Sequence, residues 1–270
     1  MLKTNLAFFK LEFNQAIQYR ASALVGVLTQ IAWGLMYIFL YSSFMNNSVG
    51  STDMTIEQMS TYIWLQQGFL MLINIWRIDP KIFADIKTGN VSMQLVRPIK
   101  LYKMWYYSVL GNKVARTLLR CIPLLIFASL PFLGQMRFMF QTDPFLLTTS
   151  IVSLVLTCLM NVAYTLIVID LVFITHDETT IRQVFNIILQ FLSGLIIPLQ
   201  FMPEWLLSIL KFTPFYYSTN LSFNIYNGYY NDPKEVLMGI GIQLVWLIVF
   251  LFIGNLLLKK KMKRVTVLGG

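Results

Sequence analysis

Long apolar blocks alternate with short polar segments along most of the chain. Within each block the apolar residues are continuous rather than alternating, which favours helices over the strands of a membrane barrel. Six blocks approach or exceed the roughly 20 residues that cross a bilayer as a helix. These are Ala21–Met45, Met59–Trp76, Tyr106–Leu133, Pro144–Ile174, Val184–Leu199 and Val236–Leu258. The pattern predicts an all-α integral membrane protein with six transmembrane helices.

Composition supports a membrane protein rather than a soluble domain. Hydrophobic residues make up 57% of the chain and charged residues 12%, and the mean hydropathy is +0.65. Soluble domains carry about 25% charged residues. Both cysteines, Cys121 and Cys158, fall in apolar blocks without a spacing motif, so we interpret them as buried thiols. With no visible internal repeat, residues 1–270 are treated as one membrane domain.

The first 20 residues have the pattern of an amphipathic helix. Charged residues interrupt any continuous apolar core, which argues against a cleavable signal peptide. The apolar positions recur every three or four residues at Leu2, Leu6, Phe9, Phe13 and Ile17. We therefore expect residues 1–20 to form a helix in the cytoplasmic interface of the membrane.

The basic residues are distributed unevenly between the polar segments. Of 21 lysines and arginines, only Arg137, Lys211 and Lys234 fall on one side of the predicted membrane. Because basic residues stay on the cytoplasmic side, both termini are predicted to be cytoplasmic, in the plasma (cytoplasmic) membrane. The same asymmetry accounts for the net charge of +9 without a nucleic-acid partner.

Charged residues within the predicted spans are candidates for buried pairs. Lys113, Arg116 and Arg120 lie three and four residues apart on one face of the third span. Long basic side chains near a helix end reach the headgroups, which is one interpretation of all three. Arg120 is the deepest of them, and Asp170 lies about one turn inside the fourth span. Since an isolated charge there is costly, the alternative hypothesis is a pair between Asp170 and Arg120 or Arg116.

Other polar residues have simpler interpretations. Thr175, His176, Asp177 and Glu178 fit a capping box before the fifth span. His176 is the chain's one histidine, so a histidine-based metal cluster is not expected. Neutral polar residues inside the spans are expected mainly to form hydrogen bonds between helices, although any of them could line a substrate path. They are Asn74, Asn161, Asn186 and Gln190.

The segment from residue 200 to 232 is rich in prolines and aromatic residues. Its prolines forbid one continuous helix, yet its apolar residues are too many for a free loop. Short helices that re-enter the outer leaflet satisfy both constraints, and an interfacial loop held by aromatic residues is the alternative. The residues that mark this outer hairpin and its approach are Gly194, Pro198, Pro203, Trp205, Pro214 and Phe215.

Two segments carry a resemblance to a known family. Residues 193–221 resemble the fifth span and outer re-entrant hairpin of type-2 permease subunits of ATP-binding-cassette (ABC) exporters. Residues 86–102 are similar to the cytoplasmic loop of that family, in which a glycine precedes a Leu-x-Arg-Pro turn. The interfacial helix, six spans and basic tail fit as well, so the resemblance extends over essentially the whole chain.

The resemblance gives the cytoplasmic loop, residues 77–103, a function. Residues 78–88 have the periodicity of a short amphipathic helix that ends at Gly89. In the family this position holds the coupling helix, which binds a groove of the ATPase. The alternative is a helix that rests on the headgroups. The expected ATPase-coupling residues are Ile78, Ile82, Phe83, Asp85, Ile86 and Lys87.

The resemblance implies a permease subunit of an ATP-driven exporter for a hydrophobic or amphipathic substrate such as a lipid, antibiotic or peptide. The chain has no Gly-x-x-x-x-Gly-Lys-Ser/Thr phosphate loop, so ATP and Mg are expected on a separate ATPase, present in two copies. A second permease, a copy or a paralogue, would complete the assembly within membrane lipid. We assign no catalytic, cofactor or metal residue. The alternatives are a secondary carrier and a membrane-embedded lipid-modifying enzyme, for which neither an inverted repeat nor a reactive cluster is visible.

Overall fold

The computed structural model describes residues 2–46, 54–76, 78, 80–91, 100–230 and 232–262, and these contain helices and connecting segments but no strand. The all-α prediction is therefore confirmed for this part of the chain. The Leu-x-Arg-Pro turn at residues 95–98 and the chain after Met262 lie outside the described residues.

Three of the described helices are long and apolar enough to cross a membrane: α2 (Arg20–Asn46), α7 (Pro144–Thr175) and α12 (Pro233–Met262). Three further helices match the other predicted spans: α3 (Ile56–Ile73), α6 (Leu101–Ala128) and α8 (Glu178–Leu192). Glutamines in α3, basic residues in α6 and the 15-residue length of α8 make these less apolar or shorter than a typical span. The count of six spans stays a prediction.

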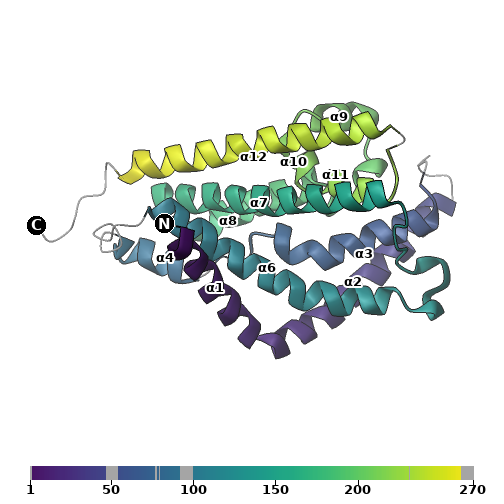
Figure 1. The fold of residues 1–270 in the computed structure, drawn as a ribbon, viewed down its shortest axis with the longest axis horizontal. Coiled ribbons are helices and arrows are strands. Elements are labelled where there is room, and N and C mark those ends of the chain that lie inside the picture. The colour runs from purple at the N-terminus through teal and green to yellow at the C-terminus, as the bar shows by residue number, and fades with distance from the viewer. Residues whose placement is uncertain are drawn as a thin grey trace, which may run out of the picture.

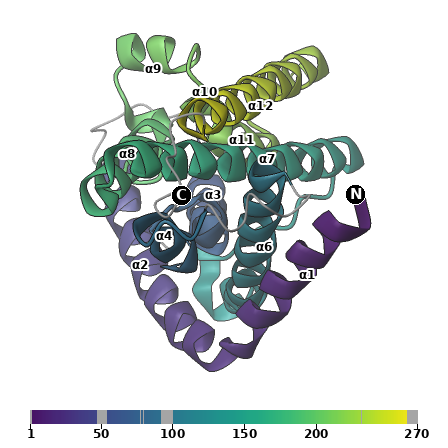
Figure 2. The same ribbon diagram turned by 90° about the vertical axis from the view of Figure 1, so that its left-hand side faces the viewer.

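Helix α3 lies in the middle of the bundle. It packs against α2, α6, α7 and the short helix α11 (Asn220–Tyr226), as Figure 2 shows from one end. Every residue from Met59 to Gly68 is buried, including Gln66 and Gln67. The 3₁₀ helix η1 (Pro131–Met136) closes one end, where Trp64 Nε1 donates to the Met136 carbonyl at 2.7 Å.

The two ends of the bundle differ in composition. Helix α4 (Pro80–Lys87), the start of α1 (Leu2–Gln18) and the lysine-rich end of α12 lie at one end, on the left in Figure 1. Helices α9 (Glu204–Leu210), α10 (Pro214–Ser218) and α11 lie at the opposite end. We call them the basic end and the hairpin end.

Helix α1 packs along α6 through small side chains. A Cβ at Gly111 would overlap the Phe9 carbonyl, so the glycine allows the two backbones to meet. Glu12 and Ala16 are buried in this contact, whereas Leu6 and Ile17 are 48% and 37% exposed. The helix is confirmed, but part of its apolar face points away from the protein. Its place in the membrane interface stays a prediction.

The chain breaks after Leu192, where α8 ends and Gly194 adopts a left-handed φ of 82°. The expected continuation of the fifth span to Leu199 is therefore wrong. The 3₁₀ helix η2 (Leu199–Phe201), α9 and α10 follow, and each comes directly after a proline or begins with one. Short helices thus replace one continuous helix, as the prolines predicted. Their depth in the membrane stays a prediction.

A buried polar network attaches the hairpin to α7 and α12. Gln243 of α12 is fully buried, and its Nε2 donates to the Tyr217 carbonyl and to Thr157 Oγ1, both at 2.9 Å. Ser222 of α11 lies 2.8 Å from the same threonine hydroxyl. Asn161 Nδ2 donates to the Ser218 carbonyl at 3.1 Å. These bonds satisfy backbone groups that the short helices leave unpaired.

Candidate coupling and transport site

Helix α4 occupies the position predicted for the coupling helix, but its apolar face is turned inward. Ile82, Phe83 and Ile86 are 6%, 2% and 4% exposed, and Ile78 is buried as well. They pack within the apolar core of the chain itself. Within this chain these four side chains face the core, and their contact with an ATPase stays a prediction. The exposed face of α4 contains Lys81, Ala84 and Lys87 instead.

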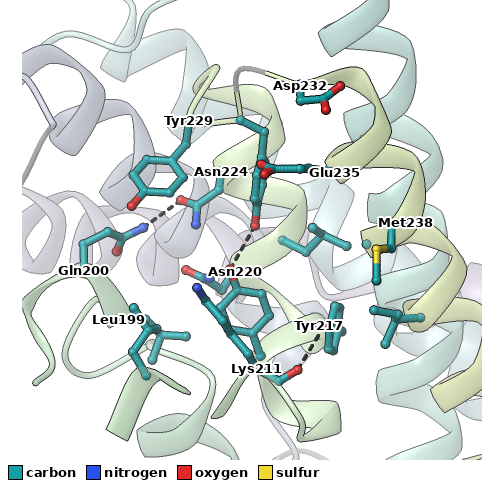
Figure 3. A pocket seen from close by; sticks show the side chains of 16 residues that line it. Leu199, Gln200, Lys211, Tyr217, Asn220, Asn224, Tyr229, Asp232, Glu235 and Met238 are labelled. Atoms are coloured by element: carbon teal, nitrogen blue, oxygen red, sulfur yellow. Dashed lines mark hydrogen bonds between the residues drawn. The ribbon is translucent and has the colours of Figure 1, made fainter. Parts of the chain in front are cut away.

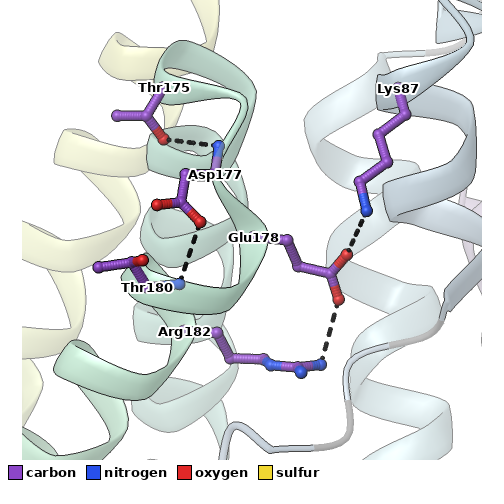
Figure 4. Close-up of polar contacts among 6 residues, drawn as sticks. All are labelled: Lys87, Thr175, Asp177, Glu178, Thr180 and Arg182. Carbon is purple, nitrogen blue, oxygen red and sulfur yellow. Dashed lines mark hydrogen bonds and ion pairs between the residues drawn. The ribbon is translucent and has the colours of Figure 1, made fainter.

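The C-terminal end of α4 is joined to the start of α8 by an ion-pair cluster (Figure 4). Lys87 Nζ lies 3.0 Å from Glu178 Oε2, and Arg182 lies 3.2 Å from the other oxygen of Glu178. Glu178 is in the first turn of α8 and Arg182 is one turn later. A charged contact thus connects the C-terminal end of α4 to the N-terminus of α8. We call Lys87, Glu178 and Arg182 the α4–α8 junction.

The turn before α8 is capped by Asp177. Its Oδ1 accepts a hydrogen bond from the Thr180 amide at 3.1 Å, and hydrogen bonding with Thr180 lowers the pKa of the Asp177 carboxyl. The negative charge also complements the helix N-terminus. The predicted capping box had Thr175 as the cap, and this is wrong. His176 takes a left-handed conformation at the end of α7, so the N-cap of α8 is Asp177, two residues after Thr175.

Lys113 of α6 binds the start of the α3–α4 connection, at the C-terminus of α3. This lysine is 4% exposed, and its Nζ donates to the carbonyls of Leu72 at 3.0 Å and Asn74 at 2.7 Å. Lys113 therefore caps the C-terminus of α3, and the interpretation in which its side chain reaches the headgroups is wrong. Asn186 of α8 accepts from the Ile75 amide at 3.3 Å. Helices α6 and α8 thus both hold the segment that leads into α4.

The predicted pair between Asp170 and an arginine is not formed. Among the described residues, neither carboxylate oxygen of Asp170 has a hydrogen-bond partner, although the residue is 1% exposed. Arg120 points instead toward α2, where its guanidinium lies against Gly26.

A cavity of about 760 Å³ lies between α2, α3 and α8. We call it the inner cavity. Its wall combines aromatic rings, amides and one guanidinium, contributed chiefly by Gln30, Trp33, Tyr37, Gln67, Arg120 and Gln190. Trp33 is 49% exposed, so the aromatic side of the cavity opens to the surface of the bundle. Cavities of this size hold drug-sized ligands.

The broken end of α8 closes the inner cavity toward the hairpin end. Three carbonyls there accept hydrogen bonds from three different elements. Tyr41 of α2 donates to Ile196 at 2.8 Å, and Gln66 of α3 donates to Gly194 at 2.6 Å. Thr219 of the hairpin donates to the Ser193 carbonyl at 3.0 Å. We call this set the α8 clamp.

A second pocket, of about 460 Å³, lies beyond the clamp between the hairpin and α12 (Figure 3). Its polar groups bond to one another. Tyr216 and Tyr230 hydroxyls are 2.9 Å apart, and Gln200 Nε2 donates to Asn224 Oδ1 at 2.7 Å. The close-up shows Gln200 and Asn224 pointing toward each other across this space. We call it the outer pocket.

The predicted hairpin residues have separate roles. A Cβ at Gly194 would lie 2.8 Å from Leu199 Cγ, so this turn requires glycine. Pro198, Pro203 and Pro214 stand at the starts of η2, α9 and α10. Their neighbours differ in burial: Trp205 is 67% exposed, and Phe215 packs edge-on against Tyr164 of α7 at 5.9 Å.

Several functional candidates were missed by sequence reasoning. Glu178 was considered only as part of a capping box, and no local signal indicates its partner on α4. Tyr41, Gln66 and Thr219 carry no motif, since each is defined by a carbonyl on a distant element. Among the described residues, no three His, Cys, Asp or Glu side chains form a group suited to a metal ion.

Comparison with known protein families decides between the interpretations. The family model described as ABC-2 family transporter protein matches residues 31–269. The chain belongs to the ABC-2 transporter family. No individual curated protein matches it. The match includes all the elements of the α4–α8 junction, the inner cavity and the outer pocket except the N-terminal part of α2.

Membership in the ABC-2 family makes the chain a transmembrane permease component of an ABC transporter, a protein that works with an ABC ATPase. Such a component is generally not the ATPase itself. Both alternatives from the sequence, a secondary carrier and a membrane-embedded enzyme, are disfavoured by the match.

Proposed function

We propose that this permease exports an amphipathic substrate from the inner cavity past the α8 clamp, driven by a separate ATPase that binds the exposed face of α4. The observation that carries the proposal is the α4–α8 junction. This ion pair joins α4, the helix proposed to meet the ATPase, to α8, which contributes to the cavity wall and ends at the clamp.

In the proposed mechanism, movement passes from α4 through the α4–α8 junction to the α8 clamp. ATPase closure presses on α4, and the junction passes that displacement to Glu178 at the start of α8. The other end of α8 holds Ser193 and Gly194, whose carbonyls are fixed by Thr219 and Gln66. A shift of α8 therefore changes the clamp that separates the inner cavity from the outer pocket. In the predicted orientation, the outer pocket faces the extracellular leaflet.

The substrate class follows from the lining of the cavity. Trp33 and Tyr37 offer apolar surface, whereas Gln67 and Gln190 offer hydrogen-bonding groups and Arg120 a positive charge. Such a wall suits a molecule with an apolar body and a polar or anionic group. Lipids, antibiotics and peptides of that kind all satisfy this description.

The experiment that tests the proposal uses the exposed face of α4. We expect Ala84→Glu to reduce co-purification of the ATPase from native membranes and to lower substrate-stimulated ATP hydrolysis at least tenfold. Because Ala84 is exposed, the thermal stability of the permease should not change. Ser208→Glu, on exposed α9 at the hairpin end, is the matched control. ATPase binding that survives Ala84→Glu, or a permease that transports without any ATPase, contradicts the proposal.

Ile82→Asp separates a structural effect from loss of the docking surface. A buried charge in the core of the chain should unfold the protein, with loss of the stable monodisperse species in detergent. If this variant loses ATPase binding but keeps its stability, Ile82 contacts the ATPase rather than the core of the chain.

A further inference from the structure

A third cavity lies at the basic end of the bundle, between α6 and α12. Both helices pack against α7, and Leu159 of α7 forms the floor of the cavity between them. The volume is about 910 Å³, the largest of the cavities described above. We call it the α6–α12 cleft. It shares no lining residue with the inner cavity or the outer pocket.

The lining of the cleft is divided by chemistry. Leu251, Leu258 and Met262 of α12 make an apolar wall. Tyr102, Tyr106 and Tyr107 of α6 stand opposite, and tyrosine is a residue that favours the level of the headgroups. The Tyr106 hydroxyl donates to the Leu159 carbonyl at 3.2 Å, which fixes this wall to the floor.

The charge on the rim has one sign. Lys100 and Lys103 precede and begin α6, and Lys259 ends the apolar part of α12, so three exposed ammonium groups border the opening. Among the described residues that line the cleft, none is acidic. The lysines therefore have no carboxylate in the cleft that would neutralise them. A ligand that matches the cleft has an apolar body, which lies against the apolar wall, and a negatively charged headgroup, which lies level with the lysines of the rim.

We propose that the α6–α12 cleft is a binding site for an anionic phospholipid, whose acyl chains lie against α12 and whose phosphate lies between Lys103 and Lys259. The site is independent of the transported substrate. Juxtamembrane lysines attract anionic headgroups with about 1 kcal/mol each, which corresponds to about fivefold in affinity. The bound lipid would join α6, which follows the coupling loop, to α12.

The test measures lipid retention by the purified, delipidated full chain. Phosphatidylglycerol or phosphatidylcholine is added in mixed micelles, and bound lipid is counted by native mass spectrometry. We expect selective retention of phosphatidylglycerol, about fivefold weaker in Lys259→Gln and about 25-fold weaker in Lys103→Gln/Lys259→Gln. Lys260→Gln is the matched control, because it removes the same charge one residue away and Lys260 does not line the cleft. Equal retention of both lipids, or an equal loss in Lys260→Gln, overturns the proposal.

Two further arms separate the lipid from other occupants. Glycerol 3-phosphate carries the headgroup charge without acyl chains, so it should not compete, and Leu251→Trp should lower retention by filling the apolar part. Efficient competition by glycerol 3-phosphate would mean a free phosphate site and would overturn the proposal. Asn255→Cys, in the cleft wall, should give no cross-linked dimer in membranes. A dimer through this position would show that a second copy of the chain covers the cleft, which also overturns the proposal.

Discussion

Lys113 shows how a single charged residue can be structural inside a membrane protein. Its ammonium group is buried but donates to two carbonyls at the end of α3, which have no partner within their own helix. The hydrogen bonds compensate part of the cost of removing a charge from water. The residue thus fixes the point where α3 leaves the bundle toward α4.

Lys113→Met tests this role. The methionine fills similar space but leaves the carbonyls of Leu72 and Asn74 without their donor, so we expect a loss of about 2 kcal/mol in unfolding free energy. Both cysteines are free and buried, so a fluorogenic thiol reagent reports unfolding on heating. The exposed Lys260→Met serves as the control. An unchanged melting temperature in Lys113→Met would show that the cap does not stabilise the fold.

Gly111 and Gly241 offer a matched pair of glycine substitutions. Gly111→Ala places a methyl group on the Phe9 carbonyl, and we expect it to displace α1 and cost about 1–3 kcal/mol. Gly241 of α12 has nothing within 4 Å of the position of a Cβ, so Gly241→Ala should be neutral or stabilise by up to about 1 kcal/mol. Limited proteolysis of α1 and thermal unfolding measure both effects. Equal stability of the two variants would contradict the close α1–α6 contact.

At the scale of elements, α8 links the two ends of the proposed mechanism. Its 15 residues extend about 22 Å at 1.5 Å per residue. One end bears Glu178 of the α4–α8 junction, and the other end bears the clamped carbonyls of Ser193 and Gly194. Sequence patterns predicted α4 and the short helices after residue 200 because amphipathic periodicity and proline act locally, but they placed the end of the fifth span at Leu199 rather than before Gly194. They did not predict the junction, since an ion pair between residues 91 positions apart leaves no local signal.

The junction can be tested by exchanging its charges. Lys87→Glu and Glu178→Lys should each reduce the coupling of ATP hydrolysis to transport, with a change in stability below about 1 kcal/mol because Lys87 is exposed. The double variant restores an attractive pair and should recover part of the activity. Recovery is partial because Arg182 remains beside residue 178. Transport and ATP hydrolysis are measured in reconstituted vesicles. A double variant no better than either single variant would argue against the junction as a coupling contact.

At the scale of the whole molecule, the inner cavity is open on one side. Its aromatic side opens to the surface, and α2 also exposes Leu28 and Phe39, at 69% and 57%. The predicted second permease subunit would close this side. The cleft between α6 and α12 lies on another side of the bundle, where we place lipid.

Cysteine cross-linking distinguishes a partner at the mouth of the inner cavity from a partner on α12. Trp33→Cys, at the mouth of the inner cavity, should cross-link to a second permease subunit in membranes, giving a species near twice the 31.3 kDa mass of the chain. Val245→Cys, 58% exposed on α12, should remain monomeric. The native cysteines are buried, which keeps the background low. Cross-linking at Val245 instead of Trp33 would place the partner on α12 and leave the inner cavity facing lipid.

The sequence by itself determined the helical class, the approximate position of each long helix and the short helices that the prolines after residue 200 impose. These features depend on local backbone chemistry and on continuous apolar composition, and both are properties of residues that are close together in the sequence. Only the tertiary structure decided which way the apolar face of α4 points, that Lys113 caps α3, and that Asp170 and the arginines stay apart. An amphipathic pattern has the same form whether its apolar face meets a partner or its own bundle, and a charge gives no indication of which distant group it will meet.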